Sequence, residues 1–353
     1  MRRAQHAPKG PSPSSQGYQM PAEWELQQAT WLAWPHDPLT WPDRLAQAQA
    51  AYETMIRALA RTQRVDLLVD PGDEAAAVRK RLAGVPNLAL HEVAHADSWI
   101  RDYGPTFVVR GEPGQRQLAF VDWIFNAWGD KYETLLPDDA ICGKLEPILA
   151  MPRFEPGIVM EGGAIDVDGQ GTLLTTEQCL LNPNRNPLLG RAQIETVLRD
   201  YLGTRKVLWL GEGIAGDDTD GHVDDIARFA APGVVLAAME PDGDSPNHAP
   251  LQENLKRLRG MTDALGRPLH VLEMPMPSWV EDGDGKALPA SYLNFLIANG
   301  VVLMPAFEEP RDAEAERVLA RAFPGRAVVR VPARDLVWGM GTVHCLSQQM
   351  PAP

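Results

Sequence analysis

The sequence has few cysteines. Cys142, Cys179 and Cys345 are the three in 353 residues, they lie far apart, and none belongs to a CxxC pair. Structural zinc sites and disulfide-stabilised small folds need clustered cysteines. The sequence therefore predicts neither a zinc site nor a disulfide framework, and a reducing cytoplasm fits it best.

Long apolar runs are also missing. A membrane-spanning helix needs about 20 consecutive apolar residues, and no stretch of this chain approaches that length. Residues 1–19 carry charges with no apolar segment behind them, unlike a secretory signal. We therefore expect no membrane partner, a disordered N-terminal arm over 1–19, and a single α/β domain over 20–353.

Basic residues are in deficit. Lys and Arg number 33 against 47 Asp and Glu, which gives a net charge of −14 at pH 7. No basic patch with interleaved aromatic residues is present, so the composition argues against a nucleic-acid partner. An acidic protein attracts cations, which is a weak pointer to a cationic ligand.

What is present is a repeating order of elements. Segments 73–84, 193–203 and 251–265 have helical apolar spacing, and each is followed by a short strand-like run and then by a hairpin-like pair. About five such units would fill the chain, each too small to bury its own apolar face. The pattern predicts a closed α/β repeat architecture with pseudo-five-fold symmetry and a central active site.

Polar landmarks follow the same period. Asp102, Glu161 and His222 are separated by intervals of about 60 residues, and Cys345 follows after about twice that interval. The skipped step falls near Gly283. If equivalent positions face a common axis, these side chains meet in one site; the alternative is a coincidence of spacing in a long α/β chain.

Cys345 stands among small and polar residues in the stretch 339–351, whereas a structural cysteine usually lies in an apolar run. A cysteine nucleophile needs a cation or a general base beside it. His344 is adjacent on an extended segment, so the two side chains would point to opposite faces. His222 is the better partner, and strand alternation would place Asp224 on its face. An isolated HxD is also typical of an acidic surface loop.

Two further acids are candidates for the same site. Asp102 ends a predicted short strand before a Gly-Pro turn, where side chains reach into sites. The alternative is a surface ion pair between Asp97 and Arg101. Glu161 lies between an apolar residue and two glycines, so we expect it to be partly buried, with His222 as its partner. The alternative is a carboxylate that caps a turn.

Two carboxylates, a histidine and a thiol in one pocket suit a guanidinium substrate. Asp102 and Asp224 would grip the planar cation through its N–H groups and leave its carbon open to Cys345. Protonated His222 would give its proton to the departing ammonia and then take one from water. This chemistry needs no metal and no cofactor.

Two stretches have the composition of a metal site. Residues 166–177 place Asp166, Asp168, Gly171 and Glu177 at EF-hand spacing. Flanking amphipathic helices are missing and the second half alternates like a strand, so we expect a hairpin turn. The acidic run 216–225 is more typical of a solvated edge.

The motifs together resemble the agmatine deiminase branch of the guanidino-group modifying (pentein) superfamily, which is shared with bacterial peptidyl-arginine deiminases. The resemblance covers nearly the whole chain after the arm. It is carried by "MPAEWELQQATWLAWPHDPLTWP" (20–42), "DSWIRDYGPTFV", "FNAWGDKY", "EGGAIDVDG", "LNPNRNP", "DTDGHVD", "LPASYLNF" and "HCLSQQMP". It implies a five-bladed α/β-propeller and a cofactor-free hydrolase, often a homodimer, that converts agmatine into N-carbamoylputrescine and ammonia on the way to putrescine.

The resemblance also implies the roles of the site residues. Cys345 is the nucleophile, His222 is first acid and then base, Asp102 and Asp224 hold the guanidinium, and Glu161 contacts the substrate or His222. The chain departs from the family where "GMGT" (339–342) replaces a "GGGN"-like stretch and where Asp218 and Asp220 replace Glu and Asn. Both departures concern the far end of the substrate.

An amine-tailed substrate would need carboxylates and aromatic rings in that region, and Trp99, Trp128, Asp218 and Asp220 are the candidates. A free arginine would need a basic residue for its carboxylate, such as Arg185, unless Arg185 braces its own turn. Agmatine is therefore the first choice, and peptidyl or free arginine or another guanidine is the second. A guanidinium-binding protein without turnover and a metal-dependent hydrolase are the alternatives of different class.

Overall fold

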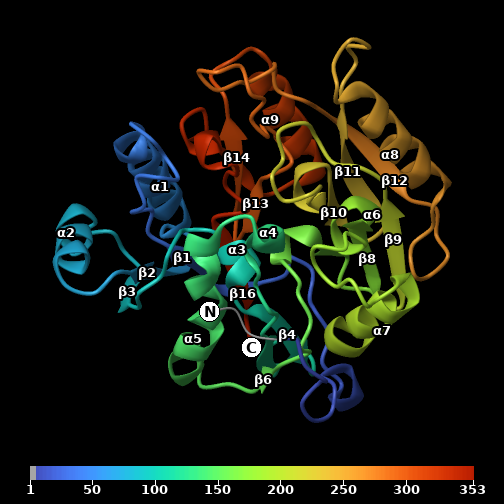
Figure 1. Cartoon of the computed structure of the whole chain (residues 1–353), viewed down its shortest axis with the longest axis horizontal. Helices are drawn as coiled ribbons and strands as arrows, with labels where there is room; N and C mark the ends of the chain where they lie inside the picture. The colour runs from blue at the N-terminus through green and yellow to red at the C-terminus, as the bar shows by residue number, and fades with distance from the viewer. Residues whose placement is uncertain (1–4) are drawn as a thin grey trace.

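The computed structural model describes residues 5–353, and these residues form five small β-sheets with helices around the outside (Figure 1). The strands of each sheet, in their spatial order within it, are as follows. The first sheet has β16 (Ser347–Pro351), β1 (Gln27–Ala33), β2 (Arg64–Val69) and β3 (Leu88–Glu92), and the second has β4 (Thr106–Arg110), β5 (Gln117–Val121) and β6 (Arg153–Phe154). The third has β7 (Asp166–Val167), β8 (Thr172–Thr176) and β9 (Lys206–Leu210), the fourth has β10 (Ala227–Ala231), β11 (Val234–Met239) and β12 (His270–Pro275), and the fifth has β13 (Leu296–Ala298), β14 (Val301–Ala306) and β15 (Ala327–Pro332). The predicted five-bladed α/β-propeller is confirmed.

Every sheet repeats one pairing pattern. Its first two strands pair antiparallel, and the second and third pair parallel. A parallel pair needs a crossover connection, usually a helix. The crossover helices are α1 (Leu45–Leu59), α2 (Asp73–Arg81), α5 (Ile141–Leu149), α7 (Arg191–Leu202), α8 (His248–Gly260) and α9 (Arg311–Ala322).

Short helical turns fill the connections between these elements. They are η1 (Ser14–Gln16), α3 (Ile100–Tyr103), α4 (Ala127–Asp130), η2 (Glu133–Ala140), η3 (Gly162–Ala164), α6 (Glu177–Leu180), η4 (Val223–Asp225) and η5 (Leu336–Gly339).

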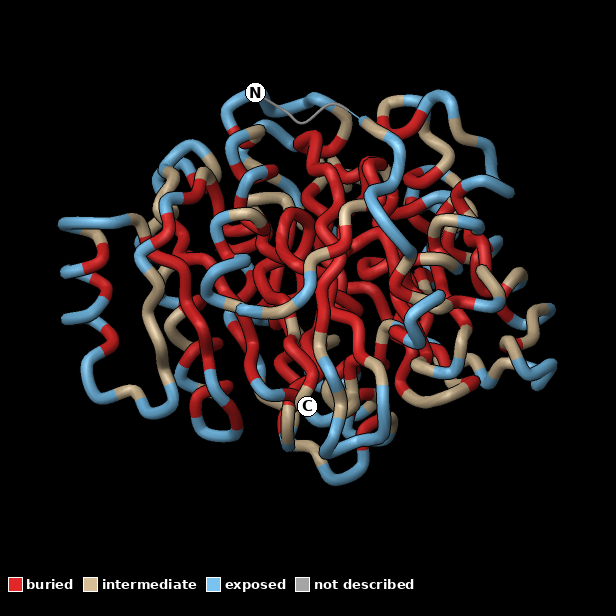
Figure 2. The backbone as a smooth tube through the Cα atoms, turned by 90° about the horizontal axis from the view of Figure 1, so that it is seen from below, coloured by how far each residue is buried: buried red, intermediate tan, exposed pale blue. Residues whose placement is uncertain are grey.

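The burial pattern explains why these residues form these elements. In α8, Leu251, Leu255 and Leu258 are buried at helical spacing and face the sheet, while the opposite side is exposed. All six residues of β14 are buried, as expected for a strand covered on both sides. Figure 2 shows the buried residues concentrated in the interior of the molecule and the exposed ones at its rim.

The repeat begins at a different element from the one that the sequence pattern indicates. The sequence reads as helix, strand and hairpin, but the second to fifth blades each consist of a hairpin, a helix and a closing strand. Helix α2 and strand β3 therefore complete one blade, and the hairpin that follows them opens the next. The first blade is closed by the two ends of the chain, because β16 pairs with β1.

The N-terminal arm differs from the expectation of a disordered segment. Residues 5–19, which we expected to be disordered, pack along the outside of the second and third blades; the first four residues of the predicted arm lie outside the described part. Tyr18 is buried, and the amide of Gln19 donates to the carbonyl of Val109 at 2.9 Å. The side chain of Gln5 donates to the carbonyl of Arg185 at 2.9 Å. These contacts offset the conformational entropy that residues 5–19 lose when they are ordered, although the segment has few apolar residues to bury.

Among the described residues, no helix is both long and apolar enough to cross a membrane.

Candidate active site

The propeller brings the predicted site residues to equivalent places in its blades. Each lies after the last strand of one blade and before the first strand of the next: Asp102 on α3, Glu161 just before η3, His222 and Asp224 at η4, and Cys345 just before β16. Asp102 thus lies on a short helix rather than at the end of a strand, and η4 replaces the predicted strand at His222. In a propeller these connections face the central axis, so residues distant in sequence meet there.

The fifth connection contributes Asn294, which we did not predict. Its side-chain amide donates to Cys345 Sγ at 3.0 Å and to Asp224 Oδ2 at 3.3 Å. We placed the skipped repeat step near Gly283, but the connection between β12 and β13 is longer than the others, so the equivalent position falls eleven residues later. The sequence signal was the "LPASYLNF" motif, which contains Asn294.

Three side chains converge on the backbone of Gly163. A Cβ atom built there would lie 2.5 Å from His222 Nδ1, 2.9 Å from Asp102 Oδ1 and 3.1 Å from Asp224 Oδ2. His222 Nδ1 and Asp102 Oδ1 are 3.9 Å apart, and Cys345 Sγ is 3.7 Å from Asp224 Oδ2. The four side chains are therefore contiguous, and only glycine leaves room for this arrangement.

Several buried polar atoms of the site have no hydrogen-bond partner among the described residues. They are both ring nitrogens of His222, Oδ1 of Asp224 and Oε2 of Glu161. A buried polar group without a partner costs roughly 1–3 kcal/mol, so such atoms are rare and a catalytic role or a bound molecule is among their explanations. The set offers acceptors and a cationic donor, which matches a guanidinium and its departing nitrogen.

The charges around the site favour the protonated form of His222 when no substrate is bound. Burial alone lowers the pKa of His222, but the charge of Asp102, the Cys179 thiol and Asp224 outweigh burial, so the pKa lies well above its ordinary value. Burial, Asp224 and neighbouring acids raise the pKa of the Cys345 thiol. At neutral pH His222 is therefore protonated and Cys345 is a thiol.

Asp102 and Asp224, the two acids predicted to hold a guanidinium, differ in the direction of their pKa shifts. Burial raises the pKa of Asp102 to about 6, although the charge of His222 acts in the opposite direction. Burial also acts to raise the pKa of Asp224, but the hydrogen bond and charge of His344 prevail and lower it. Asp224 is thus a carboxylate throughout the neutral range, whereas Asp102 takes up a proton in mild acid.

A pocket of about 450 Å³ leads to these groups. Asp102 and Cys345 lie at its inner end, and Trp99, Trp128 and Asp218 are among the residues that line it. Asp102 Oδ2 accepts a hydrogen bond from the indole of Trp128 at 2.9 Å. Three of the residues predicted for the tail of the substrate therefore border the pocket.

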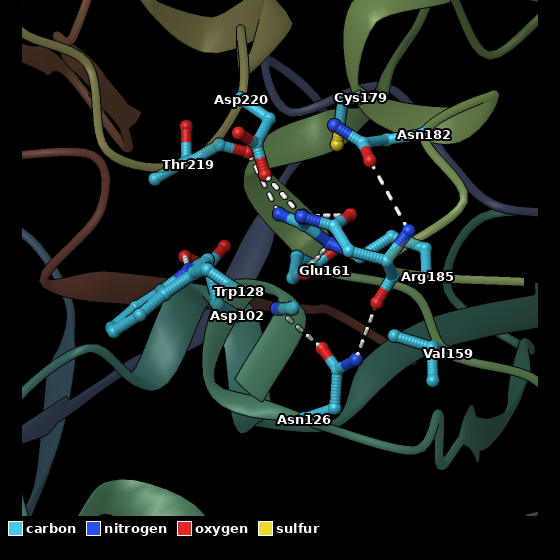
Figure 3. A network of polar contacts seen from close by, with 12 residues as sticks. Asp102, Asn126, Trp128, Val159, Glu161, Cys179, Asn182, Arg185, Thr219 and Asp220 are labelled. Carbon is cyan, nitrogen blue, oxygen red and sulfur yellow. Dashed lines mark hydrogen bonds and ion pairs between the residues drawn. The ribbon is translucent and has the colours of Figure 1, made fainter. Parts of the chain in front are cut away.

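Arg185 and Asp220, the other two, are not among the residues that line the pocket. Arg185 is fully buried and lies between Glu161 and Asp220 (Figure 3), with its Nε 2.6 Å from Glu161 Oε1 and its Nη1 2.5 Å from Asp220 Oδ2. Its Nη2 donates to the carbonyl of Thr219 at 2.7 Å. Arg185 therefore braces its own turn, and it replaces His222 as the hydrogen-bonded partner of Glu161.

The predicted EF-hand spacing forms a hairpin turn between β7 and β8, as expected. Both carboxylate oxygens of Asp168 accept hydrogen bonds, from Gln170 N and from the amide and hydroxyl of Thr172. The acids of 216–225 also have partners inside the protein: Asp217 accepts from the amides of Thr219, Gly221 and His222, and Asp220 pairs with Lys131 and Arg185.

Two groups of described side chains bring potential metal ligands within 4.8 Å of one another: Glu161 with Cys179 and His222, and His36 with Asp70 and Glu74. The first group lies against the guanidinium of Arg185, whose charge opposes a second cation. Cys179, a buried residue of α6 that sequence reasoning did not single out, is thus a neighbour of His222 in the site.

Comparison with known proteins agrees with this geometry. The model of the family "Porphyromonas-type peptidyl-arginine deiminase" matches residues 19–351. An agmatine deiminase of Stutzerimonas stutzeri (strain A1501) is 42% identical over 97% of this chain and 98% of its own length. The solved agmatine deiminase of Enterococcus faecalis has a TM-score of 0.91 at 35% identity, covering 99% of both chains. That of C. jejuni with substrate bound has a TM-score of 0.85 at 30% identity, covering 94% of this chain and 96% of its own.

With its propeller, its convergent thiol, imidazole and carboxylates, and a family match over nearly its whole length, the chain belongs to the family of Porphyromonas-type peptidyl-arginine deiminases.

Proposed function

We propose that this chain hydrolyses the guanidinium group of agmatine to N-carbamoylputrescine and ammonia. The observation that carries the proposal is the meeting of a thiol, an imidazole and two carboxylates beside a pocket that Asp102 and Cys345 line, with unpartnered buried atoms among them. The agmatine deiminases among the relatives and solved structures support the same reaction.

Binding of the substrate prepares the nucleophile. The guanidinium would lie between Asp102 and Asp224, with the free Oδ1 of Asp224 accepting from its N–H groups. The acids that raise the pKa of Cys345 would then face a positive charge. The cation therefore favours the thiolate at the moment when a thiolate is needed, and a thiol without substrate stays unreactive.

In the first half of the reaction, Cys345 Sγ bonds to the guanidinium carbon and a C–N bond breaks. The thiol loses its proton to solvent as the guanidinium binds, and His222 gives its own proton to the departing nitrogen, which leaves as ammonia, so His222 is then neutral. The product is a thiouronium on Cys345 that keeps the positive charge. The backbone amide of Gly163, which donates to Asp102 Oδ1 at 2.9 Å, holds that carboxylate in place during the step.

In the second half, water attacks the thiouronium carbon. Neutral His222, as general base, takes a proton from the water, while the C–S bond breaks and Cys345 takes the proton of the newly added hydroxyl group. The carbon keeps the oxygen, so the product is a urea. Each turnover thus consumes one water, releases one ammonia and returns the enzyme to its starting state.

The outer part of the pocket suits an amine tail. Trp99 and Trp128 offer apolar walls for methylene groups, and Asp218 offers a carboxylate for a terminal ammonium. Of the described residues that line the pocket, Lys286 is the basic one, and no arginine lines it to bind an α-carboxylate. This lining favours agmatine over free arginine.

The test is a panel of guanidines with the wild-type protein and Cys345→Ser. Agmatine, arginine and a blocked arginine peptide are each assayed for ammonia and ureido product, before and after dialysis against EDTA. We expect turnover of agmatine above the other two, unchanged by EDTA, and no turnover in Cys345→Ser with binding retained. Faster turnover of arginine or of the arginine peptide would replace agmatine as the substrate. Loss of activity with EDTA would favour a metal-dependent hydrolase, and no turnover of any guanidine would favour a binding protein.

Three other expectations remain predictions: a homodimer or higher homo-oligomer, a cytoplasmic location, and a single domain over 20–353.

A further inference from the structure

His344, the neighbour of the nucleophile, lies between two carboxylates. Its Nδ1 is 2.7 Å from Asp224 Oδ2 and its Nε2 is 2.9 Å from Glu23 Oε2. His344, Asp224 and Glu23 are all buried. The imidazole therefore connects a clamp carboxylate of the site to an acid near the start of the described chain.

The far end of this connection is fixed. Glu23 Oε2 also accepts from Arg228 Nη2 at 2.6 Å, and Glu23 Oε1 accepts from the amide of Ile297 at 2.6 Å. The amide of His344 donates to the carbonyl and to the side-chain oxygen of Asn294, at 3.0 Å each. Both the ring and its anchor are thus held by neighbouring blades, so the ring position defines where Asp224 Oδ2 lies.

The two contacts require two hydrogens, one for each nitrogen–oxygen pair. A neutral imidazole supplies one, so the second is held either by the ring as an imidazolium or by the carboxyl group of Glu23. In both cases Glu23, His344 and Asp224 together carry one negative charge. That charge is the one which a guanidinium beside Asp224 would neutralise.

We propose that His344 is a positioning residue that holds Asp224 Oδ2 so that its free Oδ1 faces the guanidinium of the substrate. This inference rests on the proposed function. Asp224 Oδ2 receives the His344 contact together with those of Asn294 and Cys345, whereas Oδ1 has no partner among the described residues. Without His344 the Asp224 carboxylate is free to rotate, and its Oδ1 is then no longer held toward the substrate.

Two amide substitutions separate the two contacts. The amide nitrogen of asparagine can occupy the place of Nδ1, so His344→Asn keeps a donor for Asp224 and loses the one for Glu23. The amide nitrogen of glutamine can occupy the place of Nε2, so His344→Gln keeps the donor for Glu23 and loses the one for Asp224. Both variants lose the same possible charge, and asparagine, one methylene shorter than glutamine, leaves the larger void, so a smaller loss in His344→Asn cannot come from better packing.

We expect His344→Gln to lower kcat/KM for agmatine by about 10- to 100-fold, mainly through KM, because a hydrogen bond to a charged group is lost. We expect His344→Asn to stay within about fivefold of wild type. His95→Gln controls for loss of a buried histidine, because both ring nitrogens of His95 face backbone carbonyls away from the pocket. Equal losses in the two His344 variants, or a greater loss in His344→Asn, would overturn the proposal.

A second measurement does not depend on the substrate. The rate of Cys345 alkylation is compared for 2-chloroacetamidine, whose amidinium group is a planar cation, and 2-chloroacetamide, its neutral counterpart with the same leaving group. We expect the cation to be favoured in the wild type and in His344→Asn, and the preference to fall about tenfold in His344→Gln. A wild type without the preference, or two variants with the same preference, contradicts the inference. Failure of the wild type to release ammonia from agmatine would instead contradict the proposed function.

Discussion

Replacement of Arg185 by methionine tests whether the buried ion pair beneath the site supports the fold rather than the substrate. The substitution removes the guanidinium but keeps an unbranched side chain of comparable length. Glu161 then loses the Arg185 Nε contact at 2.6 Å, and neither side chain of this pair is exposed to water. Glu161 is left as a buried carboxylate that has lost its ion-pair partner.

The contacts of Arg185 determine how much of the free energy of unfolding the substitution removes. Asp220 keeps Lys131 and the Asn184 amide, each at 2.9 Å, and its side chain is 20% exposed, so its loss is small. The cost therefore falls on Glu161, and removal of one partner of a buried ion pair destabilises a protein by about 3–5 kcal/mol. We expect that loss in the free energy of unfolding at pH 7.

The assay is guanidinium chloride unfolding of Arg185→Met, Glu161→Gln and the double variant. In the double variant the unpaired charge is gone, so we expect it to be more stable than Arg185→Met, with a coupling free energy of about 2 kcal/mol or more. Arg330→Met breaks an exposed pair with Glu316 and should cost about 1 kcal/mol or less. A loss in Arg185→Met no greater than in Arg330→Met, or additive losses in the double variant, would refute the reasoning.

Three further predictions concern activity. Gly163→Ala should fold but lose about 100-fold or more in kcat/KM, because its Cβ would displace His222, which lies 2.5 Å away; near-normal kinetics would contradict the convergence. The pH profile of kcat/KM should fall as pH drops through about 6, where Asp102 gains a proton and loses its negative charge; a profile flat between pH 5 and 7 would argue against Asp102 as a clamp. Asp218→Asn should raise KM for agmatine about tenfold with little change in kcat, whereas an unchanged KM would place the ammonium elsewhere.

The repeat could be predicted from sequence because its signal is redundant. Helical spacing, strand runs and polar landmarks recur with one period, so an error in one unit is corrected by the others. The predicted first element of the repeat was wrong, because a series of similar units can be divided at any element. Which strand closes a blade depends on pairing across the chain, and the pairing of β16 with β1 joins segments from opposite ends.

The site was predictable where a residue had a repeat position and a chemical role, as with Cys345 and His222. Asn294 was missed because the loop before β13 is longer and breaks the interval. His344 was set aside because alternation on an extended segment would turn it away from Cys345. The segment just before β16 is a turn instead of a strand, so that rule does not apply, and Asp224 Oδ2 contacts both side chains.

The pairing of β16 with β1 has a consequence for synthesis. A nascent chain that ends before Cys345 already contains the imidazole of His222 and the carboxylates of Asp102 and Asp224, but it lacks both the reactive sulfur and the strand that begins two residues later, so it has no chemistry. Strand β1, made early, meanwhile presents an unsatisfied edge that can pair with another chain. Completion of the polypeptide thus both supplies the reactive atom and covers the edge, and C-terminal truncation should give an inert, aggregating product.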